Sequence, residues 1–282
     1  MQAARKKQRA AARADAARPS KPVSPISRAI GLIPNRVALA GGWIDQPFVS
    51  QHNPTPPGSM VVVSLQPSFR VMDRAGCASG TRTIAMKLWN GRLPNRPREE
   101  LVRKLYEAEN KGKADPSGSQ DMIGLVYPGI SRLDYDFAAN GGVFPVHIES
   151  ITDLRIARWL EQVLHVLPVE PRPEGYSPLG KQRLDPTWIS RLGETGRLCF
   201  DAIRRRDIQA LGRSLNQCMV CWERILPHTV AHPTIKLDLK KLLRAYQQQY
   251  AGAMYSGCGG GYLLVISNVA VPGAFKVRVR TE

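Results

Sequence analysis

Short runs of hydrophobic residues dominate the first half of the chain, and glycine or proline separates one run from the next. Such runs are typical of β-strands when β-branched residues are frequent in them. The proline-rich segment 51–59 is expected to be a loop, and Asn140-Gly141-Gly142 favours a hairpin turn. We therefore expect strands at 36–40, 60–65, 131–137 and 143–148.

Elsewhere apolar residues recur three and four positions apart, which is the spacing of one face of an α-helix. The predicted helices cover 81–89, 98–111, 153–164, 186–226 and 237–250. The longest of them is expected to be interrupted near Gly212 and to end before Pro227. Residues 168–178 are rich in proline and predict a loop, and strands are expected at 262–266 and 274–279.

The distribution of these elements favours an α+β fold in two lobes. Strands and loops dominate before residue 150, and helices dominate after it. We expect an N-terminal domain at 25–150 and a C-terminal domain at 151–282, preceded by a basic tail at 1–24.

The net charge of +17 is the unusual feature of the composition, and it invites a nucleic-acid interpretation. Residues 1–22 alone contain seven lysines and arginines against one acid. A solvated, disordered tail accounts for this run, and a nucleic-acid arm or a targeting peptide are the alternatives. The chain has no zinc-finger spacing and no basic run interleaved with aromatic residues, so nucleic acid is not the expected partner.

Other properties of the composition favour a globular cytoplasmic protein. The longest apolar run, 262–266, is far shorter than the ~20 residues that cross a bilayer, so no membrane association is expected. Five scattered cysteines do not form a secreted disulfide framework, and reduced thiols are the simpler assumption. The sequence does not indicate an oligomeric state.

Asp121 is the first candidate for chemistry. It is a carboxylate in a small-residue turn that follows a charged helix and precedes an apolar stretch, within 115–129. That placement suits a catalytic base, because the tight backbone holds the carboxylate and the apolar residues exclude water. Two glycine-containing segments, 35–45 and 256–265, are its companions, and together the three suggest one enzyme site.

The segment Cys77-Ala78-Ser79-Gly80-Thr81 leads into a predicted helix. Such a loop directs backbone N–H groups and the positive end of a helix dipole at an anion, although a plain helix cap is the commoner origin of the pattern. Glu109 could join Ser79 or Thr81 in holding Mg²⁺ through oxygen atoms, or could be a solvated helix glutamate.

These segments, in this order, resemble the GHMP kinases, the superfamily of galactokinase, homoserine kinase, mevalonate kinase and phosphomevalonate kinase. The first motif most resembles the branch that phosphorylates heptoses and fucose, through Arg36, Gly41, Gly42, Asp45 and Pro47. The stretch 116–121 resembles the catalytic-base segment of the family, and 252–261 resembles its third motif. The resemblance spans nearly everything from residue 35 to the C-terminus and implies a two-lobed fold with the site between the lobes.

The resemblance also implies a role for individual residues. Asp121 would take the proton from a substrate hydroxyl, and Arg36 would favour the ionised form of Asp121 and steady developing charge. Ser79 and Glu109 would hold Mg²⁺. The substrate would contact Asp45, Gly42, Trp43 and Gln120, and the nucleotide ATP would contact Gly76, Ala78, Ser79, Gly80, Thr81, Arg82, Gly257, Gly259 and Gly260. Trp43 could stack on a sugar face or pack against the core.

Two departures from the family pattern concern the nucleotide half. The stretch 74–82 lacks one glycine and one serine of the usual phosphate loop. It gains Arg82, which could pair with phosphate or lie on the surface. About 35 residues separate Gly41 from Gly76, which shortens the nucleotide-binding lobe.

The expected function is therefore that of an ATP-dependent small-molecule kinase, a phosphotransferase acting on a hydroxyl of a sugar or sugar phosphate, with Mg²⁺ as cofactor. One alternative is a non-catalytic sugar- or nucleotide-binding protein with the same fold. A second is a nucleic-acid-binding protein that acts through its basic tail.

Overall fold

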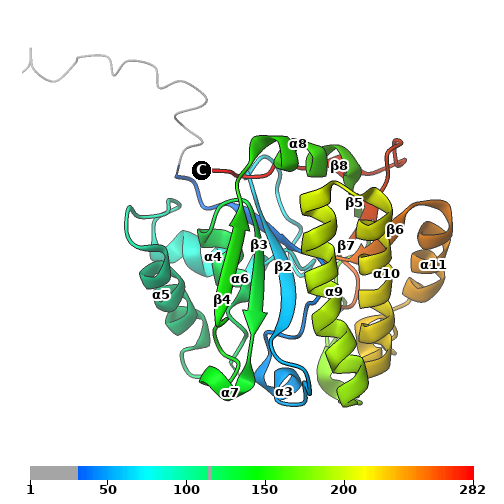
Figure 1. The fold of residues 1–282 in the computed structure, drawn as a ribbon, viewed down its shortest axis with the longest axis horizontal. Helices are drawn as coiled ribbons and strands as arrows, with labels where there is room; N and C mark the ends of the chain where they lie inside the picture. The colour runs from blue at the N-terminus through cyan, green and yellow to red at the C-terminus, as the bar shows by residue number, and fades with distance from the viewer. Residues whose placement is uncertain (1–30, 114–115) are drawn as a thin grey trace, which may run out of the picture. The chain divides into compact units, whose positions relative to one another are not determined.

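The structure is a computed structural model of the 282-residue chain, and it describes residues 31–113 and 116–282. The expected tail at 1–24 lies outside the described residues. Residues 33–282 form one compact unit that contains two four-stranded antiparallel sheets (Figure 1). None of the described helices is long and apolar enough to cross a membrane.

The first sheet has the strand order β1-β2-β3-β4. Its strands are β1 (Asn35–Ala38), β2 (Gly58–Leu65), β3 (Ile130–Tyr135) and β4 (His147–Ile151). Every residue of β2 is buried, because α6 (Gln120–Val126) and α9 (Pro186–Arg205) both pack against it. The remaining helices of this half are α3 (Pro47–Ser50), α4 (Ser79–Leu88), α5 (Arg98–Asn110) and α7 (Phe137–Asn140).

The second sheet has the order β6-β7-β5-β8. Its strands are β5 (Leu164–Pro168), β6 (Gly252–Tyr255), β7 (Tyr262–Ile266) and β8 (Phe275–Lys276). The helices α10 (Ile208–Ile225) and α11 (Leu239–Gln249) pack against β6, and α8 (Leu154–Val163) packs against β5. Two short 3₁₀ turns, η1 (Pro178–Gly180) and η2 (Pro227–Thr229), complete this half.

Aspartate side chains start the helices of the second half. Asp153, Asp185, Asp207 and Asp238 occupy the N-cap positions of α8, α9, α10 and α11, and each accepts a hydrogen bond from a backbone N–H of the first turn. Such a cap contributes on the order of 1 kcal/mol. By contrast, α4 begins without any side-chain cap, and its Ser79 N–H donates to the Gly76 carbonyl at 3.1 Å.

The α+β class is confirmed, and several element boundaries are corrected. The second strand of the expected hairpin lies at 147–151 instead of 143–148, because α7 occupies the connection. The helix break lies at Arg206–Asp207, where Arg206 is left-handed, and α10 runs unbroken through Gly212. A Cβ atom on Gly212 would lie 2.1 Å from the Ala251 carbonyl oxygen, so this glycine permits close contact between helix and strand.

Each sheet is built from one side of residue 151, but α9 of the second half packs against β2 of the first. The division into domains near residue 150 stays a prediction. The strands β5 and β6 were not predicted from the sequence.

Candidate active site

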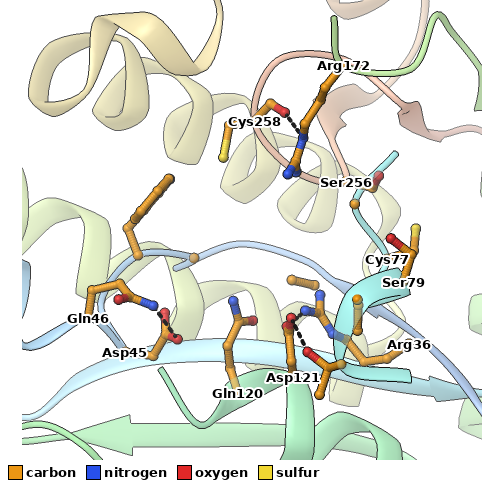
Figure 2. Close-up of a pocket in the computed structure, with 18 of the residues that line it drawn as sticks. Arg36, Asp45, Gln46, Cys77, Ser79, Gln120, Asp121, Arg172, Ser256 and Cys258 are labelled. Carbon is orange, nitrogen blue, oxygen red and sulfur yellow. Dashed lines mark hydrogen bonds and ion pairs between the residues drawn. The ribbon is translucent and has the colours of Figure 1, made fainter. Parts of the chain in front are cut away.

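A cavity of about 260 Å³ lies where four segments meet (Figure 2). They are β1 with the turn that follows it, the loop before α4, the start of α6, and the glycine turn at 256–258. The cavity is lined by most of the residues expected at the site, namely Arg36, Gly42, Trp43, Asp45, Gly76, Ala78, Ser79, Gly80, Thr81, Glu109, Gln120, Asp121 and Gly257. The three sequence segments singled out above therefore do converge.

Asp121 lies in the first turn of α6 and faces the cavity. One carboxylate oxygen is in direct contact with the guanidinium of Arg36, and the other accepts a hydrogen bond from the Thr81 hydroxyl at 3.2 Å. The side chain of Asp121 is 27% exposed, whereas that of Arg36 is only 4% exposed. The carboxylate is thus fixed from two sides and remains accessible to a ligand.

The side chain of Arg36 extends from β1 and packs against α6 at Gly124. A Cβ atom on Gly124 would lie 2.2 Å from Cγ of Arg36, so glycine at that position of α6 makes room for the arginine stem. Burial lowers the pKa of Arg36 to about 10, against the opposing influence of Cys77, Asp45 and Glu109. The guanidinium therefore remains charged at neutral pH.

Asp45 is fully buried in the turn after β1. Its Oδ2 atom accepts a hydrogen bond from Gln46 at 3.3 Å, and its Oδ1 atom is buried without a hydrogen-bond partner among the described residues. Burial raises the pKa of Asp45 to about 6, although Arg36 opposes the shift. A Cβ atom on Gly118 would lie 1.9 Å from Oδ2 of Asp45, so the glycine before α6 leaves space for this carboxylate. The free Oδ1 atom is suited to accept a hydrogen bond from a ligand hydroxyl.

The loop before α4 has an unusual backbone. Gly76, Cys77 and Ala78 have φ angles of 81°, 53° and 57°, so three successive residues are left-handed. This conformation turns the first residues of α4, Ser79 and Gly80, toward the cavity. Backbone N–H groups in the first turn of a helix have no carbonyl partner within the helix and attract anions. The arrangement suits a phosphate group better than the plain cap that the sequence also allowed.

Glu109, at the end of α5, borders the same cavity. Its Oε1 atom lies 3.6 Å from Nζ of Lys113, and its Oε2 atom is buried without a hydrogen-bond partner among the described residues. The described residues form no cluster of three or more acidic, histidine or cysteine side chains around a metal position. Mg²⁺ usually takes only one or two protein oxygens and completes its shell with water and phosphate oxygens. The free oxygen of Glu109, together with Ser79 in the same cavity, fits that requirement.

Several lining residues were missed by sequence reasoning, and Arg172 is the most important of them. It lies in the proline-rich segment after β5 and points into the cavity from the side opposite Asp121 (Figure 2). Its Nε donates to the Cys258 carbonyl at 2.6 Å, and no carboxylate pairs with it among the described residues. Nothing in the local sequence signals this position, because only the glycine turn, distant in the chain, brings it into the site. The other unpredicted lining residues are Ala38, Gln46, Cys77, Trp222, Ser256 and Cys258.

Trp43 both lines the cavity and packs against other aromatic residues. Its ring centroid lies 6.2 Å from that of Phe48 and 6.5 Å from that of Trp222, in edge-to-face geometry. The indole N–H of Trp222 donates to the Gly42 carbonyl at 3.0 Å, which ties α10 to the turn after β1. The position of Trp43 is therefore compatible both with stacking on a sugar face and with packing against the core.

Three of the residues expected to contact the nucleotide do not line the cavity. Arg82 donates from Nε and Nη2 to the carbonyls of Pro34 and Ile33, at 2.9 and 3.0 Å, so its guanidinium is occupied by backbone. Gly259 lies against the ring of Tyr176, and Gly260 lies against the backbone next to β5. In the structure Arg82 braces the chain before β1, and the two glycines permit close packing. Their expected role as nucleotide ligands stays a prediction that their position outside the cavity does not support.

Comparison with known proteins identifies the fold. No protein-family model and no curated protein matches the sequence. Among solved structures, galactokinase of Lactococcus lactis in complex with galactose matches with a TM-score of 0.59 at 12% identity, over 89% of this chain and 93% of that one. A mevalonate kinase matches with a TM-score of 0.57 at 11% identity, over 89% of this chain and 99% of that one. A D-glycero-D-manno-heptose 1-phosphate kinase from Bacteroides thetaiotaomicron matches with a TM-score of 0.51 at 11% identity, over 88% of this chain and 95% of that one.

These three structures belong to the superfamily that the motifs resemble. The chain therefore has the fold of the GHMP kinases, and the expectation drawn from its motifs is confirmed at the level of the fold.

Proposed function

We propose that this chain is a small-molecule kinase that transfers the γ-phosphoryl group of ATP to a hydroxyl of a sugar or sugar phosphate. The observation that supports the proposal is the meeting, in one cavity, of an accessible carboxylate and an uncapped helix terminus. Phosphoryl transfer requires little beyond positioned groups of this kind, because positioning and electrostatic stabilisation supply most of the catalysis.

On the acceptor side, Asp121 acts as the general base. It removes the proton of the attacking hydroxyl while the hydroxyl oxygen forms a bond to the γ-phosphorus. The bond between the γ-phosphorus and the β–γ bridging oxygen breaks, and ADP leaves. Arg36 and Thr81 hold the carboxylate in place through the contacts described above.

The acceptor itself is held by polar groups that have no partner in the protein. Oδ1 of Asp45 and Oε1 of Gln120 are both buried acceptors without hydrogen-bond donors among the described residues, and both residues line the cavity. A ligand with several hydroxyl groups would satisfy them.

On the donor side, the first turn of α4 binds the phosphates through its backbone N–H groups. Ser79 and Glu109 would hold Mg²⁺, which neutralises charge on the phosphate oxygens when bound. Arg172 faces them from across the cavity and is free to pair with the group in transfer or with an anionic group of the acceptor.

The proposal is tested by measuring ADP release over a panel of sugars and sugar phosphates with the wild type, Asp121→Asn and Asp73→Asn. Asp73 is exposed and lies outside the cavity, so it controls for the loss of one carboxylate. We expect substrate-dependent ADP release from the wild type and from the control, and a kcat about 10²- to 10⁴-fold lower for Asp121→Asn. Absence of substrate-dependent ADP from the wild type would overturn the proposal, as would an unchanged kcat in Asp121→Asn.

A second candidate is a binding protein that has lost phosphotransfer, and the loop before α4 favours it. Cys77 and Ala78 take left-handed conformations that are usual for glycine, and the described chain forms no helix or strand between β2 and α4. Retained sugar binding without binding of Mg²⁺·ATP would support this alternative.

A further inference from the structure

A second cavity, of about 580 Å³, lies on the surface between α10, α11, η2 and the segment 181–183 that follows η1. It shares no lining residue with the candidate active site. Its charged lining residues are Lys181, Arg183, Arg224, Lys240, Arg244 and Glu223. We call this cavity the basic groove, because five of these six residues are cationic.

The residues that line the basic groove all belong to the described part of the chain. Residues 1–30 contain eight lysines and arginines and one acid, so they account for 7 of the 17 net positive charges. The remainder of the chain therefore carries a net charge of +10 by itself. The excess of charge that the tail leaves unexplained is in part concentrated in this groove.

Packing holds the walls of the groove in place. The ammonium group of Lys240 at the start of α11 is in direct contact with the carboxylate of Glu223 on α10. The backbone N–H of Arg183 donates to the Ile225 carbonyl at 2.8 Å. The guanidinium of Arg224 lies 5.3 Å from the centroid of the Trp188 ring. The groove is thus assembled from three segments that specific contacts join.

Most of the cations in the groove are not neutralised. Lys181, Arg183, Arg224 and Arg244 have no carboxylate partner among the described residues, and all four are exposed. Like charges brought together in this way repel one another unless an anion lies between them.

One histidine of the groove, His228, has a pKa that is shifted in part by the neighbouring positive charge. Burial, His232 and the charge of Lys181 together lower the pKa of His228, which also lines the groove. The Nδ1 atom of His228 is buried and has no hydrogen-bond partner among the described residues.

We propose that the basic groove is a second ligand site that binds a compact polyanion, a small molecule carrying two or more phosphate groups. The volume lies within the range of small-molecule sites, and lysine and arginine are the side chains that pair with phosphate. No aromatic residue other than His228 lines the groove, so it lacks the stacking surface typical of single-stranded nucleic-acid sites. This site is additional to the proposed kinase function and does not depend on it.

The test is a calorimetric titration of the full chain with inorganic tripolyphosphate at fixed ionic strength. Arg183→Gln combined with Arg244→Gln removes two charges from the groove. Lys87→Gln combined with Lys104→Gln removes two exposed charges outside it and serves as the matched control. We expect the groove variant to bind at least about tenfold more weakly and the control to change less than about twofold. Equal affinity in the two double variants would overturn the proposal.

Two further arms identify other binding positions. Gly80→Asp places a negative charge in the first turn of α4, and loss of tripolyphosphate binding in this variant alone would assign the anion to the candidate active site and overturn the proposal. A single-stranded RNA oligonucleotide is titrated in parallel. Groove-dependent binding of RNA without binding of tripolyphosphate would replace the small polyanion by nucleic acid and would equally overturn it.

Discussion

The two sides of the candidate site differ in how their polar groups are held. On the acceptor side, Arg36 and Asp45 are 3% and 0% exposed. Gly124 in α6 leaves space for the first side chain, and Gly118 before α6 leaves space for the second. On the donor side, the loop at 76–81 is left-handed at three successive positions, and a Cβ atom on Gly80 would meet nothing within 4 Å. The acceptor side is packed around buried charges, whereas the donor side has open space at the first turn of α4.

This difference predicts opposite sensitivities to substitution. A change on the acceptor side disturbs buried charges and should cost stability or alter its dependence on pH. A change on the donor side should have little effect on folding and should appear mainly in ligand binding.

The largest expected effect on stability concerns Asp45. Its pKa is about 6 in the folded chain and 3.8 in the unfolded one, so the folded state holds its proton more tightly. The contribution of Asp45 to stability is therefore fully present below pH 3.8 and is lost as the pH rises through 6, by on the order of 3 kcal/mol. The variant Asp45→Asn lacks this titrating group and avoids the loss. In urea unfolding, the free energy of unfolding of the variant minus that of the wild type should therefore increase from pH 4 to pH 8. The exposed Asp73→Asn serves as the control, and a gain that is independent of pH would contradict the prediction.

A smaller effect is expected from adding one methyl group on either side. Gly118→Ala forces the new Cβ against the carboxylate of Asp45 and should lower the free energy of unfolding by about 1–3 kcal/mol. Gly80→Ala meets open space in the first turn of α4 and should leave stability unchanged or raise it by less than about 1 kcal/mol. Chemical denaturation of the two variants compares them directly. An equal loss in both would show that the acceptor side is no more tightly packed than the donor side.

The smallest effect concerns the strained backbone of the donor loop. Ala78 has a φ of 57° and a ψ of 29°, a conformation that costs a residue with a Cβ atom about 1–2 kcal/mol. Ala78→Gly relieves this cost but adds freedom to the unfolded chain, so a net gain of about 0.5–1 kcal/mol is expected in urea unfolding. Ala85→Gly, in the right-handed interior of α4, should instead lose about 1 kcal/mol. A loss in both variants would argue against strain at Ala78.

Local patterns singled out the segments that form the acceptor side, and the motif resemblance implied roles for Arg36, Asp45 and Gln120. Asp121 follows a small-residue turn, and Arg36 precedes a glycine pair, so local sequence placed each of them next to a turn. The structure joins them through a contact between β1 and α6, which the motif resemblance implied and the periodicity alone did not.

Long-range packing explains where the sequence-based expectations were wrong. Gly212 looked like a helix break, yet it serves the contact between α10 and the segment before β6. For Arg82 the sequence left pairing with phosphate and a surface position open, and the structure shows its guanidinium donating to the carbonyls of residues 33 and 34. Arg172 gave no signal, because the residue that orients it, Cys258, is 86 positions away. Each of these contacts joins segments that no local pattern relates.

The central claim is that the open loop before α4 binds the phosphates of a nucleotide opposite Asp121. A calorimetric titration with Mg²⁺ and a non-hydrolysable ATP analogue tests it most directly, on the wild type, Gly80→Asp and Asn90→Asp. Asn90 is exposed just beyond the far end of α4, so its variant adds the same charge outside the cavity. We predict one nucleotide bound per wild-type chain, similar affinity for Asn90→Asp, and at least about tenfold weaker binding for Gly80→Asp, because like charges repel at close range. No binding by the wild type, or the same affinity in all three proteins, would contradict the claim.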